Sequence, residues 1–165
     1  MRRLQYLLWL TIVVILMGLM ACGPRETELP FETIEQYHRS EGYDSPEPCL
    51  VLITSQQEID RLESLVSRGA LEQLAELDFQ QYFAIAVFRG VRPTSGYDII
   101  IERIARRGDK IVVYAQFWEP RLDQVILPEV TSPYHLIKVR RGDGVSQETE
   151  LVFQSQIVTS TPPSR

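Results

Sequence analysis

The spacing of hydrophobic residues predicts one clear helix in the first half of the chain. In the stretch "SQQEIDRLESLVSRG", from Ser55 to Gly69, hydrophobic residues recur every three or four positions, as they do on one face of a helix. Ser55 and Glu58 have the S-x-x-E spacing of a capping box, and Gly69 can end the helix with a left-handed cap. We therefore predict a helix over Ser55–Arg68, followed by a further helical turn or two before Asp78.

Most of the remaining chain consists of short runs rich in β-branched and aromatic residues, which predict strands. These runs are "FETIEQYH", "CLVLIT", "YFAIAVFRG", "YDIIIERIAR", "KIVVYAQFW", "YHLIKVRR" and "ETELVFQSQIV". The fourth and fifth runs flank "RGD" and should form a hairpin, and the last two should form a second strand pair. The segment "EPRLDQVILPEVTSP" has too many prolines for a regular central strand. The pattern predicts a single α+β domain, with a mainly antiparallel, curved sheet of about six strands and one or two packed helices.

The first 21 residues follow another pattern. Arg2 and Arg3 precede an uncharged run from Leu4 to Ala21, which is the layout of an export signal. Its apolar centre, Leu7–Met20, is shorter than the roughly 20 residues that a membrane-spanning helix needs. An uncleaved anchor and an ordinary secreted protein are the alternatives to a lipoprotein signal.

The end of this signal, Leu19-Met20-Ala21-Cys22, resembles the lipobox of bacterial lipoproteins. The resemblance implies cleavage before Cys22 and attachment of a diacylglycerol to its thiol, and more than one acyl chain anchors a protein firmly. We expect a protein exported and lipid-anchored to the cell membrane or outer membrane of a bacterium. The expected organisation is a signal peptide over 1–21, lipidated cysteine and tether over 22–30, one domain over 31–158 and a disordered tail over 159–165.

Charge and cysteine content narrow the choice of partners. The chain has 22 acidic and 17 basic residues, and loss of Arg2 and Arg3 with the signal makes it more acidic still. Such a balance argues against nucleic acid as a partner. Lipidation of Cys22 would leave Cys49 without an intramolecular disulfide partner, as a buried residue or a free thiol. Without lipidation, a disulfide between the two cysteines is the main alternative.

Sequence signatures of enzymes are scarce. The chain has no G-x-S-x-G, P-loop, dinucleotide-binding or H-E-x-x-H motif, and its two histidines are His38 and His135. Neither histidine has the spacing of a metal site, and a nucleophilic pair with Cys49 would require spatial convergence that the sequence does not indicate. We expect no enzymatic activity, no cofactor and no metal.

One block of the sequence resembles a known family. The pattern "FRG…SGYDIIIERI…GDKIVVYAQFWEP…TSPYHLIKV" is similar to the C-terminal domain of PrcB, a lipoprotein subunit of a bacterial surface protease complex. The resemblance is carried by Phe88, Arg89, Gly90, Gly96, Tyr97, Thr131, Pro133, Tyr134 and His135. It implies a non-enzymatic, protein-binding domain at the cell surface.

The residues that carry this resemblance have two interpretations. They shape loops and pack at strand starts, or they form a binding surface from two neighbouring loops. The candidate binding surface consists of Gly96, Tyr97, Thr131, Pro133, Tyr134 and His135. The function expected is binding or stabilisation of an envelope protein, including a protease. A small-ligand or cell-wall-glycan binder is the alternative, and its mark would be an aromatic pocket around Trp118 and Tyr114.

Overall fold

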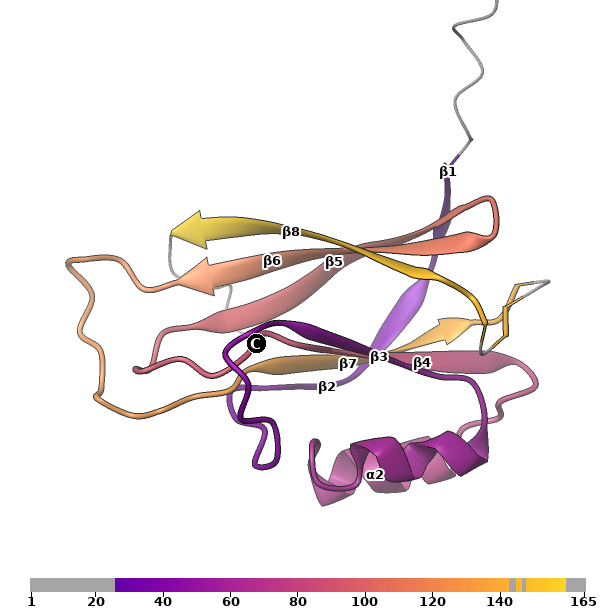
Figure 1. The fold of residues 1–165 in the computed structure, drawn as a ribbon, viewed down its shortest axis with the longest axis horizontal. Coiled ribbons are helices and arrows are strands. Elements are labelled where there is room, and N and C mark those ends of the chain that lie inside the picture. The colour runs from indigo at the N-terminus through magenta and orange to yellow at the C-terminus, as the bar shows by residue number, and fades with distance from the viewer. Residues whose placement is uncertain (1–25, 143–144, 147, 160–165) are drawn as a thin grey trace, which may run out of the picture.

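A computed structural model describes residues 26–142, 145–146 and 148–159 (Figure 1). The predictions for the signal, for lipidation of Cys22 and for residues 160–165 of the tail lie outside these residues. The strands are β1 (Glu26–Leu29), β2 (Phe31–Tyr37), β3 (Cys49–Ile53), β4 (Tyr82–Phe88), β5 (Asp98–Arg107), β6 (Lys110–Glu119), β7 (Tyr134–Arg140) and β8 (Leu151–Thr159). The helices are the 3-10 helix η1 (Gln56–Leu62) and the α-helix α2 (Arg68–Ala75).

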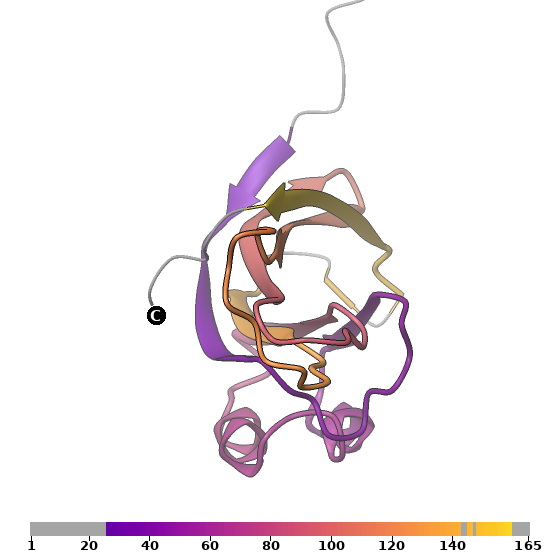
Figure 2. The same cartoon turned by 90° about the vertical axis from the view of Figure 1, so that its left-hand side faces the viewer.

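The strands of the described residues form two four-stranded sheets, where the sequence predicted one sheet of about six strands. Their orders are β1-β5-β6-β8 and β2-β7-β4-β3. The two sheets face each other, and the helices cover the outer face of the second sheet (Figures 1 and 2). The predicted α+β class and the mainly antiparallel pairing are confirmed, because only the pairing of β6 with β8 is parallel among the described strands.

Strand β4 lies at the centre of the molecule and is buried on both faces. Phe83, Ile85 and Val87 point into the apolar layer between the two sheets. The alternate residues Ala84 and Ala86 face a second apolar layer beneath the helices. Because successive side chains of a strand point to opposite faces, a strand between two such layers must be apolar throughout.

The predicted helix over Ser55–Arg68 begins where expected, after Ser55, but it is a 3-10 helix that ends at Leu62. The chain forms η1 and then turns, and α2 begins only after Ser67, whose side chain accepts a hydrogen bond from the Ala70 N–H at 3.1 Å. Ser55 makes no side-chain cap. The local spacing identified helical residues, but Ser67 provides the cap that starts the regular helix.

Two other predictions are corrected by the pairing of strands. β7 and β8 do not pair with each other, because β7 lies between β2 and β4 in the other sheet. β8 therefore returns alongside β6 in the same direction. The part of the predicted tether that the structure describes is the strand β1, which pairs with β5. Residues 120–130 form no strand, as their prolines predict.

A group of charged and polar side chains holds β1 in place. The Glu26 carboxylate accepts hydrogen bonds from the Tyr114 hydroxyl at 2.7 Å and from Arg103 at 3.1 Å, and it pairs with Arg107. The hydrogen bond from Tyr114, followed by the contact with Arg107, lowers the pKa of Glu26 to about 2.

In the part of the chain that the structure describes, no helix is long and apolar enough to span a bilayer.

Candidate functional site

Four of the six residues predicted to form a binding surface are buried. Thr131, Pro133, Tyr134 and His135 lie at the start of β7 with little or no exposed surface. They do not form the exposed amphipathic patch that the sequence suggested, and their contacts are internal. The structure supports the other interpretation for these four, in which they shape a loop and pack at a strand start.

The His135 ring links the two sheets. Its Nδ1 accepts a hydrogen bond from the Ile101 N–H of β5 at 2.8 Å, and its Nε2 lies 2.8 Å from the Thr33 hydroxyl of β2. A backbone N–H can only donate, so in the neutral ring the proton is on Nε2, which donates to Thr33. Both ring nitrogens thus have partners within the fold.

The Tyr134 hydroxyl joins β7 to β2 and to the start of α2. It donates to the Glu35 carboxylate and accepts from the Ser67 N–H at 3.0 Å. The Ser67 hydroxyl donates to the same carboxylate at 2.6 Å. Burial raises the pKa of the Tyr134 hydroxyl above its usual value. This arrangement satisfies polar groups beneath the helix and has a structural role.

Two positions in the loop between β4 and β5 require glycine, because other parts of the chain lie very close to them. Gly90 has φ +91°, and a Cβ there would lie 2.4 Å from the Pro46 carbonyl oxygen. Gly96 has φ +88°, and a Cβ there would lie 2.9 Å from the Pro120 Cβ. Both positions therefore exclude larger residues by conformation and by space.

Arg89 is a buried charged residue whose role the sequence did not indicate. Its side chain is 1% exposed and donates to the carbonyl oxygens of Asp98 at 3.0 Å and Trp118 at 2.6 Å. It also donates to the Glu119 carboxylate at 2.9 Å, and its guanidinium lies 4.9 Å from the Tyr97 ring centre. Burial lowers the pKa of Arg89 to about 10. Arg89 thus fastens β4 to the adjoining ends of β5 and β6.

Most of the exposed large apolar side chains of the described residues lie in residues 120–130, which we call the apolar loop. Leu122 is fully exposed, Val125 is 93% exposed and Leu127 is 60% exposed. The loop is fixed to its neighbour, since the Leu127 N–H donates to the Ser95 hydroxyl at 2.8 Å and the Ser95 N–H donates to the Leu127 carbonyl at 3.0 Å. The sequence could have indicated this exposed surface. The segment contains apolar residues between prolines, and prolines keep it out of a central strand, so some of these residues must remain exposed.

An aromatic pocket shared by Trp118 and Tyr114, which would mark the small-ligand alternative, is not seen at the hollow that Tyr114 lines. Tyr114 lines a shallow hollow of about 220 Å³ together with residues of β8, and Trp118 is not part of its wall. The Tyr114 ring is covered by the Arg103 guanidinium at 3.8 Å. Among the described residues, no three His, Cys, Asp or Glu side chains are grouped so that they could hold a metal ion.

Comparison with known proteins gives one family. Residues 83–140, from β4 to the end of β7, match the family described as PrcB C-terminal. This match confirms the resemblance predicted from the sequence. Searches of the curated proteins and of the solved structures found no match. The matched segment contains Arg89, both glycines, His135 and the whole apolar loop.

Proposed function

We propose that this protein is a non-enzymatic accessory protein of the bacterial envelope, anchored by a lipid on Cys22, which binds and stabilises a partner protein. The proposed partner class is a protease complex. The PrcB C-terminal match over residues 83–140 supports an accessory role of this kind.

The observation that carries the proposal is the apolar loop. Side chains that are exposed at 60% or more, such as Val125 and Leu127, are costly to leave in water when they are clustered. The loop is held by the mutual hydrogen bonds of Ser95 and Leu127, so that little ordering is needed when a partner binds. An ordered, exposed apolar surface of this kind fits a protein partner.

Glu26, the first described residue after Cys22, and the apolar loop lie at opposite ends of β6. Glu26 follows Cys22 by four positions and contacts Arg107 beside the β5–β6 turn. The apolar loop follows Glu119 at the other end of this ten-residue strand, about 30 Å away. The loop would thus remain clear of the point where the lipid joins the domain.

The test is to purify the tagged full chain in detergent from the membranes of its own bacterium and to quantify the proteins that come with it. We expect one envelope protein in a fixed ratio. Leu122→Ser with Val125→Ser should lower that ratio at least about tenfold, because two exposed apolar side chains lose their burial against the partner. Arg121→Gln, which changes the same loop but keeps its apolar residues, is the control.

This experiment has three possible results. Loss of the partner in the double variant alone, together with a shorter partner half-life in cells, supports the proposal. Equal recovery with the double variant would exclude the apolar loop as the binding surface. A lipidated chain that brings down no protein would favour the small-ligand alternative.

A further inference from the structure

The two sheets end in four edge strands, which are β1 and β8 in the first sheet and β2 and β3 in the second. Viewed along the sheets, β1 continues into β2 on one side of the molecule (Figure 2), and the other two edge strands, β3 and β8, contact each other. An edge strand presents unpaired N–H and C=O groups on which another strand can add, and proteins usually protect such edges.

Two of the edges are protected by length, charge or irregular pairing. β1 has only four residues, and its Glu26 is held by two arginines. β2 carries Glu32 and Glu35, and its register with β7 shifts between Thr33 and Glu35. Short strands, charges and bulges all hinder the addition of a further strand.

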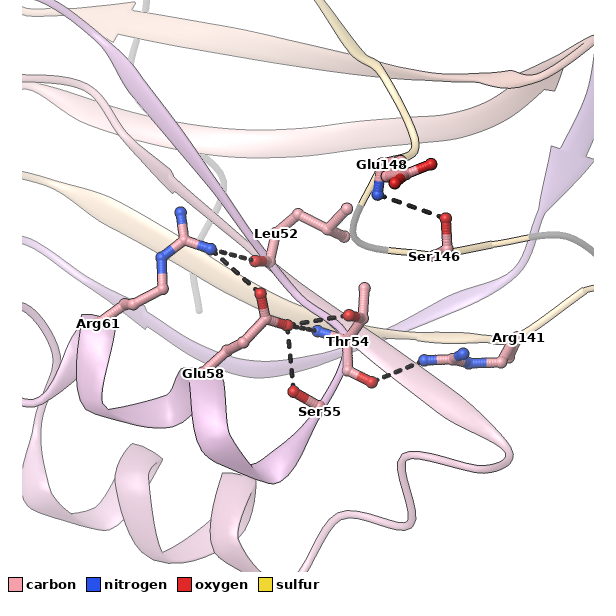
Figure 3. Close-up of polar contacts among 8 residues, drawn as sticks. All are labelled: Leu52, Thr54, Ser55, Glu58, Arg61, Arg141, Ser146 and Glu148. Carbon is pink, nitrogen blue, oxygen red and sulfur yellow. Dashed lines mark hydrogen bonds and ion pairs between the residues drawn. The ribbon is translucent and has the colours of Figure 1, made fainter.

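The β3 edge is covered by a polar cluster at the start of η1 (Figure 3). Arg61 donates to the Leu52 carbonyl at 3.3 Å, and the Glu58 carboxylate accepts from the Thr54 N–H at 2.7 Å. Arg141 donates to the Thr54 carbonyl at 2.7 Å. These side chains occupy the backbone groups that another strand would need.

β8 contacts β3 of the facing sheet, but it lacks the short length, the charges and the irregular pairing that protect the other edges. Its nine residues, "LVFQSQIVT", include no charge and no proline, and its register with β6 is regular from Leu151 to Thr159. The stretch from Gln154 to Ile157 is exposed, and Ile157 is 67% exposed. A long, uncharged and regular edge strand is a ready template for pairing.

We propose that β8 pairs antiparallel with β8 of a second copy of this chain, about a twofold axis at Ser155. The strand is self-complementary in this register. Ser155 lies opposite itself, Gln154 opposite Gln156, Phe153 opposite Ile157, and Val152 opposite Val158. A twofold interface requires the same surface to match itself, and this strand places polar residues opposite polar ones and apolar residues opposite apolar ones.

The pairing would join two four-stranded sheets into one of eight strands and cover the exposed Ile157 of each copy with Phe153 of the other. Two acidic molecules would meet along an uncharged strand, which avoids repulsion at the contact. This inference rests on the sheet edges and not on the apolar loop, so it can fail or succeed independently of the proposed function.

Cysteine cross-linking of the detergent-extracted full chain tests the register. In a Cys49→Ser background, Ser155→Cys should form an intermolecular disulfide rapidly on oxidation, because each Cys faces its own copy. Thr159→Cys, on the same strand, should react at least about tenfold more slowly, because its copies lie eight positions apart along the strand, roughly 27 Å. The background protein without either substitution corrects for Cys22.

Sedimentation of the same preparations tests the dimer itself. We expect the unmodified chain to form a concentration-dependent dimer, and Ser155→Lys to remain monomeric with an unchanged circular dichroism spectrum, because two lysines would face each other. The proposal is overturned by an unmodified chain that stays monomeric at all concentrations, by a Ser155→Lys dimer, or by equal cross-linking at positions 155 and 159. A monomer that adds a strand from a different protein would also overturn it.

Discussion

Arg89 shows how a single charged side chain can organise the end of a sheet. Its guanidinium reaches two carbonyl oxygens and the Glu119 carboxylate, while its flat face lies near Tyr97 and Phe117. Burying this charge is tolerable only because these acceptors replace water. Removal of the side chain would leave the acceptors without their partner in a poorly hydrated region.

We predict that Arg89→Ala lowers the free energy of unfolding by about 3 kcal/mol, since two carbonyl oxygens and the partly exposed Glu119 carboxylate would lose a charged donor. Urea denaturation followed by tryptophan fluorescence would measure the loss. Arg68→Ala is the matched control, because Arg68 is 92% exposed and its pair with Glu72 contributes about 0.5 kcal/mol or less. Similar losses in the two variants would contradict the role assigned to Arg89.

At the scale of elements, β1 depends on electrostatics more than on burial. Glu26, Thr27 and Glu28 are exposed, and only Leu29 packs on the apolar layer between the sheets. The strand is joined to β5 by backbone pairing from Glu26 to Leu29 and to the β5–β6 hairpin by the contacts of Glu26. A strand with little buried surface is expected to open locally before the rest of the molecule unfolds.

The lowered pKa of Glu26 predicts the pH at which β1 loosens. A carboxyl whose folded pKa is depressed stabilises the fold fully above its ordinary value of 4.5, and that stabilisation is lost as the pH falls through about 2. Protection of the Thr27–Leu29 amides from hydrogen exchange should therefore fall over this range in the unmodified chain. Glu26→Gln should show low protection already at pH 7, without this acid-dependent change.

Glu28→Gln, on the same strand, serves as the control for that measurement. It removes a carboxylate from β1 while keeping the contacts of Glu26 with Arg103 and Arg107. The assignment would be wrong if the two glutamine variants exchanged at the same rate at pH 7.

At the scale of the whole molecule, the proposed activities separate in space. The β1 end would receive the lipid anchor, the apolar loop would contact a partner, and the β8 edge would join a second copy. The apolar loop follows the end of β6, whereas β8 runs along the side of β6. Each can therefore be disabled without removing the other.

Intact mass of the membrane-extracted protein would test the anchor. We expect a chain that begins at Cys22 and carries a diacylglycerol, and an uncleaved, unlipidated chain for Cys22→Ser, because the thiol is the site of attachment. Cys49→Ser is the control and should be processed normally. A soluble chain, or an unmodified protein that keeps residues 1–21, would contradict the lipoprotein interpretation.

The sequence by itself determined every described strand except β1, and it determined the family resemblance. Strands such as β4 and β5 follow from local runs of apolar and β-branched residues, and the β5–β6 hairpin follows from the glycine at its turn, Gly108, with φ +66°. The residues that carry the resemblance follow one another in local order along the chain, so they could be recognised without knowing any contact.

Only the tertiary structure decided which strands pair, where the regular helix begins and which side chains reach the surface. Ser67 caps α2 beside Glu35 and Tyr134, which lie far from it in the sequence. His135 is buried because β2 and β5 supply its partners, and Val125 is exposed because no element covers it. Pairing and burial depend on hydrogen bonds and contacts between distant segments, which the local spacing of residues does not specify.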